Sequence, residues 1–272
     1  MYNLVQTGHL SGKESTGFAS KYYKKRLKKI EGILQLPWQE ITQEGIHELR
    51  VELKKMRALF ELLRYSDKDF RFSKFFGPFK LLFKMAGTIR GAQVEQELLK
   101  KSMPDTPSKY LDQLQRLEKK KRRAVEKITP GTFAKIKSQK SRITSRLDTV
   151  TENDVKSLLK KRAKQLSALM ERSIFKEQDL HIIRKKLKGF YFIAKTTYPN
   201  MSIPKPCNRL QLLFGTWHDN QVAIDHLRKA VFSSQFNQAE IKQLQKIKRE
   251  LIENREKLFD QILSTYVLIE RT

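Results

Sequence analysis

Apolar residues recur along the chain at the three- and four-residue spacing of amphipathic helices, and no stretch alternates long enough to predict a strand. The clearest helix is predicted over residues 46–64. Its apolar face comprises Leu49, Leu53, Met56, Phe60 and Leu63. The pattern predicts an all-helical protein.

The cations of this stretch occupy an informative part of the helix. His47, Arg50, Lys54 and Arg57 share an arc of roughly 80° when plotted at about 100° per residue. We call these four residues the basic arc. The arc borders the apolar face, whereas a helix that needs only solubility carries its cations on the far side. A neighbouring helix would therefore enclose these side chains in a groove.

The pattern returns in the second part of the chain, over residues 180–195. At an offset of 134 residues, the positions of His47, Arg50, Leu53 and Lys54 are repeated by His181, Arg184, Leu187 and Lys188. The cationic run of residues 24–28 returns at 160–164. The two runs contribute the candidate contacts Lys24, Lys28, Lys160 and Lys164, for which a solvated helix face is the open alternative. The agreement indicates an internal duplication.

Further matches extend the duplication and define the predicted helices. Residues 85–94 align with residues 213–222, so that Arg90 corresponds to His218 in the alignment. We predict eight helices in two groups of four, with a possible kink at Gly77-Pro78 and a break at Thr129-Pro130-Gly131. A loose lead-in, a first half and a second half are expected over residues 1–17, 18–147 and 152–272, with the polar stretch 148–153 as the boundary.

Charge indicates the class of partner. The net charge is +27 and the pI is near 10.1, which favours nucleic acid, polyphosphate or an anionic membrane surface as the partner. Lysine-coated helices from a basic proteome are the alternative. The run Lys119–Arg123 covers more than one helical turn, so we expect most of it to face water and to attract anions from the periphery.

Three histidines, His47, His181 and His218, invite a metal-site interpretation, but cations surround each of them, so we predict no metal. A histidine among cations would tighten anion binding as the pH falls through its pKa. Catalysis is also not expected. No phosphate-cradling glycine loop is present, and Glu95 and Glu97 of a helix diverge by about 200°. We predict no catalytic residue and no cofactor.

The two H-x-x-R-x-x-x-K helices and the segment Leu213-Phe-Gly-Thr-Trp-His-Asp219 resemble the conserved histidine α-helical domain (CHAD) family. The resemblance extends from about residue 18 onward. It implies two pseudo-symmetric four-helix bundles and a basic central groove that binds inorganic polyphosphate. Lys55 and Lys185 also match family positions. Gly189 and Tyr191 replace further cations of the second helix, and Gly91 replaces an aspartate, so we expect the first half to contribute more.

We therefore predict non-catalytic binding of inorganic polyphosphate. The expected contacts are His47, Arg50, Lys54, Arg57, His181, Arg184, Lys185, Lys188, Arg90, His218, Lys24, Lys28, Lys160 and Lys164. RNA binding through the same surface is the main alternative, and an enzyme acting on phosphate esters is the second. The single cysteine, Cys207, and the absence of a long apolar run favour a cytoplasmic protein without membrane insertion. Polyphosphate granules are a candidate location. The oligomeric state is left open.

Overall fold

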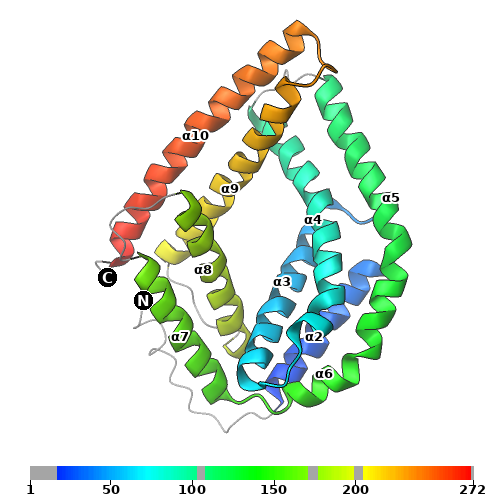
Figure 1. The fold of residues 1–272 in the computed structure, drawn as a ribbon, viewed down its shortest axis with the longest axis vertical. Coiled ribbons are helices and arrows are strands. Elements are labelled where there is room, and N and C mark those ends of the chain that lie inside the picture. The colour runs from blue at the N-terminus through cyan, green and yellow to red at the C-terminus, as the bar shows by residue number, and fades with distance from the viewer. Residues whose placement is uncertain (1–16, 103–107, 171–176, 199–204, 271–272) are drawn as a thin grey trace. The chain divides into compact units, whose positions relative to one another are not determined.

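All regular structure in the computed structural model is helical (Figure 1). The structure describes residues 17–102, 108–170, 177–198 and 205–270. Within these ranges there are nine helices and no strand, which confirms the all-helical prediction. The helices are α2 (Phe18–Leu34), α3 (Gln43–Ser66), α4 (Phe72–Ser102), α5 (Ser108–Ser138), α6 (Lys140–Leu147), α7 (Glu152–Met170), α8 (Glu177–Thr197), α9 (Lys205–Val231) and α10 (Gln238–Glu270).

The described residues form two compact units that do not coincide with the two halves of the sequence. The first unit draws on residues 1–88 and 121–202, and the second on residues 89–120 and 203–272. The first unit contains α2, α3, α6, α7 and α8, the second contains α9 and α10, and α4 and α5 contribute to each. Helices from both sequence halves therefore build one unit, while the duplication itself stays a prediction.

The core of the first unit is organised around α3. All five residues of its predicted apolar face are fully buried. The ring of Phe60 packs against four other rings, with centroid distances between 5.3 and 6.3 Å. These neighbours are Tyr23, Phe70, Phe76 and Phe79. Helices α2, α7 and α8 each pack on α3. Burial of several aromatic side chains at one point gives this unit a well-defined centre.

Local capping explains where α3 begins. The Thr42 hydroxyl accepts a hydrogen bond from the Gly45 N–H at 3.0 Å, and Glu44 lies in the first turn, where a negative charge is favourable. Arg64 lies in the last turn, where a positive charge is favourable. The helix consequently starts three residues before the predicted position.

The predicted break at Thr129-Pro130-Gly131 is wrong, because α5 continues through Pro130 to Ser138. Contacts with Trp38 hold the helical turn that precedes the proline. The Thr129 hydroxyl donates to the Val125 carbonyl at 2.9 Å and accepts from the Trp38 indole N–H at 2.8 Å. The Glu126 carboxylate accepts from the Trp38 backbone N–H at 2.6 Å. The helix is instead interrupted at Gln139. The short helix α6 that follows is additional to the eight predicted helices.

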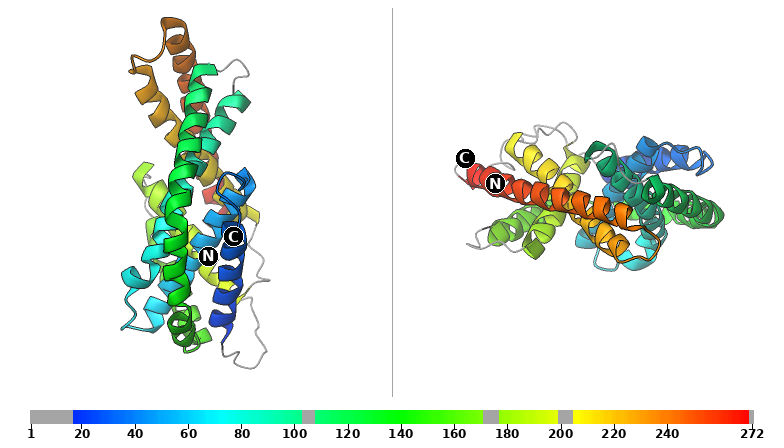
Figure 2. Two further views of the ribbon diagram at one scale, coloured as in Figure 1. Left: turned by 90° about the vertical axis from the view of Figure 1, so that its right-hand side faces the viewer. Right: turned by 90° about the horizontal axis from the view of Figure 1, so that it is seen from above.

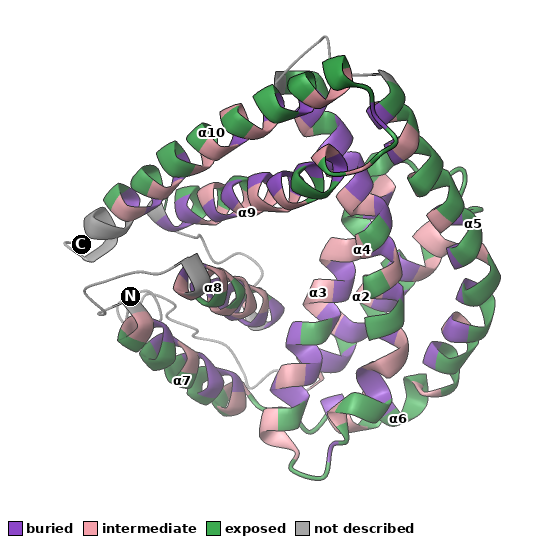
Figure 3. Ribbon diagram, turned by 45° about the horizontal axis from the view of Figure 1, so that its top comes forward, coloured by how far each residue is buried: buried purple, intermediate pink, exposed green. Residues whose placement is uncertain are grey.

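The second unit is built on the antiparallel pair α9 and α10 (Figures 1 and 2). The buried residues of α10 lie on the side that faces α9 (Figure 3). Its core also takes Leu99 from α4 and Tyr110 and Leu114 from α5. Among the described residues, no helix combines the length and apolar character that a membrane span requires.

Candidate polyanion-binding site

The structure gathers most of the predicted binding residues into one unit. All of them except Arg90 and His218 belong to helices of the first unit. The two helices that carry the repeated histidine motif, α3 and α8, pack directly on each other, and α2 and α7 each contact both (Figure 1). Segments 134 residues apart in the sequence thus become neighbours.

Arg50 of the basic arc is held against α4. Its Nη1 donates to the Phe83 carbonyl oxygen at 3.1 Å, and its guanidinium carbon lies 4.5 Å from the centre of the Phe83 ring. A Cβ atom at Gly87 would lie only 2.5 Å from the same Nη1. Glycine at position 87 therefore leaves the space that the guanidinium occupies. Both contacts reduce the freedom of the half-buried arginine and prepare it to bind a ligand.

The basic arc also contains a carboxylate that sequence reasoning did not single out. Glu61 follows Arg57 by one helical turn and projects between the directions of Arg50 and Lys54 on the α3 wheel. Its Oε1 accepts from Arg57 Nε at 3.1 Å, and its Oε2 accepts from Arg162 Nη2 of α7 at 2.8 Å. Only 13% of the Glu61 side chain is exposed. The carboxylate therefore joins α3 to α7 within the basic arc.

Arg162 is a further cation that the sequence-based list omitted. Its Nη1 lies 3.6 Å from the position that a Cβ atom of Gly189 would take. Gly189 is the position of α8 where the family resemblance implies a cation. An arginine from the neighbouring helix α7 thus brings positive charge beside the residue that lacks it. The signal available in the sequence is the central arginine of the cationic run 160–164.

A second carboxylate of α3 lies on the side opposite the basic arc. Glu52 is 1% exposed, and it accepts from Arg26 of α2 at 3.2 Å and from Lys55 at 2.6 Å. Glu52 and Glu61 are nine residues apart, which places them about 180° from each other on the helix. Lys55, which matches a family position, therefore points away from the arc and pairs with Glu52 of its own helix.

The second motif helix, α8, combines partly buried and exposed cations. Arg184, Lys188 and His181 are half-buried, and Lys185 is exposed. Burial lowers the pKa of His181 below its ordinary value of 6.5, and the charges of Lys185 and Arg184 lower it further. Tyr191, which replaces a cation, is buried in the core. The positive potential that depresses the pKa of His181 is the potential that would attract an anion.

The lysines of the opening helices are all exposed. They are Lys24 and Lys28 of α2 and Lys160 and Lys164 of α7. Their contact with a ligand stays a prediction. The run Lys119–Arg123 is solvated as expected apart from Arg122, which is buried and donates to the Ile41 carbonyl at 2.8 Å and to the Trp38 carbonyl. Arg122 therefore anchors the segment between α2 and α3 instead of attracting anions.

The two remaining predicted residues lie in the second unit. Arg90 forms a two-pronged ion pair with Glu97 at 3.0 and 3.2 Å, and His218 of α9 is half-buried. Glu95 is buried and points elsewhere. It accepts from the Tyr110 hydroxyl at 2.5 Å and lies 2.5 Å from His226 Nδ1. The expected divergence of Glu95 and Glu97 is therefore observed, and both carboxylates are engaged.

Comparisons with known proteins now identify the family. A model described as the CHAD domain matches residues 22–228, which is most of the chain. The chain belongs to the CHAD family. The solved CHAD domain from the plant Ricinus communis is similar with a TM-score of 0.73 and 14% identity, covering 94% of this chain and 93% of that one. PptA from Streptomyces chartreusis is similar with a TM-score of 0.68 and 11% identity, covering 92% and 99%.

At these identities the two structures show a shared CHAD fold and nothing more specific. A comparison with curated proteins finds no match. In the part of this CHAD chain that the structure describes, no three histidine, cysteine, aspartate or glutamate side chains form a group able to hold a metal ion.

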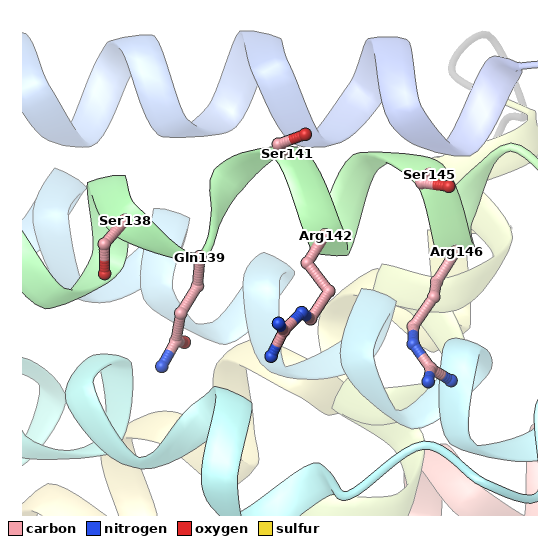
Figure 4. Close-up of a pocket in the computed structure, with 6 residues that line it drawn as sticks. All are labelled: Ser138, Gln139, Ser141, Arg142, Ser145 and Arg146. Atoms are coloured by element: carbon pink, nitrogen blue, oxygen red, sulfur yellow. The ribbon is translucent and has the colours of Figure 1, made fainter.

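A cavity of about 600 Å³ lies on α6, outside the two CHAD histidine helices (Figure 4). It is lined by Ser138, Gln139, Ser141, Arg142, Ser145 and Arg146. The lining carries two positive charges, those of Arg142 and Arg146, and the ion pair of Arg146 with Asp67 offsets one of them. All six lining residues are polar or charged, and none of them is a predicted binding residue.

Proposed function

We propose that this CHAD chain binds inorganic polyphosphate, without transforming it, along the cations that α3 and α8 present in the first unit. The observation that carries the proposal is the direct packing of these two motif helices. It brings the basic arc and the cations of α8 into one neighbourhood, as a chain of linked phosphates requires. The family resemblance implies the same ligand.

Binding is electrostatic in this proposal. Arginine contacts two phosphate oxygens with its planar fork, whereas lysine acts as a point charge. Release of condensed counterions drives association and makes it dependent on salt. If about six phosphates are neutralised, a fourfold rise in salt lowers the affinity by roughly a hundred- to a thousandfold, using the slope for single strands.

The aromatic residues favour polyphosphate over RNA. A single-strand binder usually presents exposed aromatic faces on which bases stack. None of the described aromatic side chains of the first unit is exposed. Several of the half-buried rings carry the protein's own cations, as Phe83 carries Arg50, Tyr22 carries Arg26 and Phe72 carries Arg64. A base would have to displace these cations before it could stack.

We propose binding without hydrolysis or transfer of phosphate because of the partners that the carboxylates have. Enzymes of phosphoryl transfer commonly place carboxylates where they bind metal ions or activate a nucleophile. Glu61, the carboxylate within the basic arc, is bound by two arginines, and Glu52 is bound by Arg26 and Lys55. In both places the carboxylate neutralises and orients cations.

Competition between long-chain polyphosphate and single-stranded RNA, at equal phosphate concentration and near-physiological salt, tests the proposal. We expect polyphosphate to displace RNA. Bound polyphosphate should also stabilise the fold, by about 2.7 kcal/mol at 100 times its dissociation constant. A clear preference for RNA would replace polyphosphate with RNA as the ligand, and release of orthophosphate from the bound chain would make the protein an enzyme.

A further inference from the structure

The basic arc contains its own anion. Glu61 occupies the middle of an arc whose other members are cations, and it engages two guanidinium groups, one from α3 and one from α7. An incoming phosphate that binds Arg57 or Arg162 must compete with this carboxylate, because each arginine already uses part of its fork on Glu61. Charge-assisted bonds of this kind are about twice as strong as neutral ones.

We infer that Glu61 is a selectivity residue that holds Arg57 and Arg162 in place of a ligand, and that Arg162 of α7 is itself a polyphosphate-binding residue. The inference rests on the proposed function and extends it. Arg162 lies over Gly189, where α8 lacks a cation, so the chain restores positive charge from a neighbouring helix. Glu61 keeps that charge oriented while the site is empty.

Such an arrangement discriminates by the number of linked phosphates. An isolated phosphate gains little when it replaces a carboxylate that is already in place. A long chain that is bound elsewhere along α3 and α8 presents its next phosphate at a high effective concentration, so it displaces Glu61 more readily. We therefore expect Glu61 to weaken the binding of short phosphates more than that of long chains.

The other carboxylates of α3 provide matched controls. Glu48 is an exposed residue of the same helix that pairs with Lys29 at 3.3 Å and lies on the side away from the arc. Replacing Glu48 by glutamine changes the net charge by the same amount as replacing Glu61. A purely general electrostatic effect would therefore appear equally in both variants.

The test measures the binding of long-chain polyphosphate and of pyrophosphate to the full chain and to four variants. The variants are Glu61→Gln, Glu48→Gln, Arg162→Gln and the double variant Glu61→Gln with Arg162→Gln. We expect Glu61→Gln to raise the affinity for long-chain polyphosphate about three- to tenfold, since two charge-assisted bonds no longer compete. The fold-increase in affinity for pyrophosphate should be larger. Glu48→Gln should change both affinities less than twofold.

Arg162→Gln should weaken polyphosphate binding about three- to tenfold, and in the double variant it should remove at least half of the gain from Glu61→Gln. The double variant removes both charges of the Glu61–Arg162 pair and leaves without Glu61 only Arg57, which is exposed to water, so it is the form to use if a single variant unfolds. In that case the inference requires a reduced preference for long chains over pyrophosphate relative to the unmodified protein.

The outcomes separate the two proposals. If the unmodified chain fails to bind polyphosphate, the proposed function fails and this inference fails with it. If the unmodified chain binds polyphosphate but Glu61→Gln behaves like Glu48→Gln, only the role of Glu61 is overturned. An unchanged affinity in folded Arg162→Gln removes Arg162 from the site.

Discussion

Helices α3 and α8 carry the same motif, yet their surroundings differ. Each is contacted by an arginine from an opening helix, Arg26 of α2 or Arg162 of α7, and these two arginines occupy equivalent places in the repeat, 136 residues apart. Both nevertheless pair with carboxylates of α3, on opposite sides of that helix. The carboxylate partners of Arg26 and Arg162, Glu52 and Glu61, both belong to α3, and the α8 position equivalent to Glu52 is Lys186.

Two arginines at equivalent positions of the predicted repeat therefore have different surroundings. Arg26 meets a carboxylate that is 1% exposed, so it belongs to the structural contact between α2 and α3. Arg162 meets a more accessible carboxylate beside the basic arc, which agrees with the proposal that it binds the ligand. Equivalent sequence positions therefore do not predict equivalent roles, and the asymmetry is open to experiment.

The largest expected effect comes from removing the motif arginine of both helices. We expect Arg50→Ala with Arg184→Ala to lose about a hundredfold in polyphosphate affinity, because each removes charge-assisted contacts worth about tenfold or more. Arg50→Ala alone should cost more than Arg184→Ala alone, since Phe83 and Gly87 preorganise Arg50. Titration of each variant with polyphosphate measures the affinity, and circular dichroism verifies that the variant is folded. Full affinity in the double variant would remove these helices from the site.

Stability should separate the two opening-helix arginines. Arg26→Ala leaves the buried Glu52 paired with Lys55 but without its arginine, and we expect it to lower the free energy of unfolding by about 2 kcal/mol. Arg162→Ala should cost less than about 1 kcal/mol, because Glu61 keeps Arg57 and is more accessible to water. Urea denaturation gives both values, and equal losses would contradict the assignment of different roles.

Gly87→Ala tests the preorganisation of Arg50. The added methyl group would lie 2.5 Å from Nη1, so the guanidinium has to move away from Phe83. We expect polyphosphate affinity to fall about threefold, with little net change in stability, because the helix propensity gained by alanine offsets the cost of displacing the end of the Arg50 side chain.

The matched control for this substitution is Gly215→Ala, the equivalent position in the second half, where a Cβ atom would meet nothing within 4 Å. It should leave affinity unchanged and raise the free energy of unfolding by up to about 1 kcal/mol through helix propensity. If the two alanine variants bind polyphosphate with equal affinity, Gly87 has no role in ligand binding.

His181 should give α8 a modest pH dependence of binding. Its pKa lies below 6.5 in the free protein, and a bound polyanion would raise it, so affinity should rise as the pH falls below 6.5. The expected increase is about three- to tenfold, and it should be absent in His181→Gln. Titrations between pH 7.5 and about pH 5 measure it. An identical pH profile for the variant would exclude His181 as the source.

The smallest effect concerns stability in the second unit. The hydrogen bond with Glu95 raises the pKa of His226 above its ordinary value of 6.5, despite the opposing effects of burial and of Lys229. A raised pKa in the folded state means that this contribution to stability is complete below pH 6.5 and is lost as the pH rises through the folded value. Unfolding of His226→Gln should therefore differ from that of the unmodified chain less at pH 8 than at pH 6. A constant difference would contradict the linkage.

Much of the helical structure followed from periodicity. The buried face of α3 agrees with the predicted apolar face, because apolar spacing is a local property of the chain. The proline at position 130 misled the prediction, since contacts from Trp38 hold α5 together there. Burial of Arg122 escaped notice for the same reason, as its carbonyl partners are more than eighty residues away.

The sequence by itself determined the helical class, the apolar stripe of α3 and the arc of cations beside it, because helix geometry alone relates residues three and four apart. The tertiary structure decided which helices share a unit, which carboxylate meets each arginine, and that Gly87 and Gly189 leave room for guanidinium groups. Those relations join residues of different helices, and the packing of side chains across helices sets them.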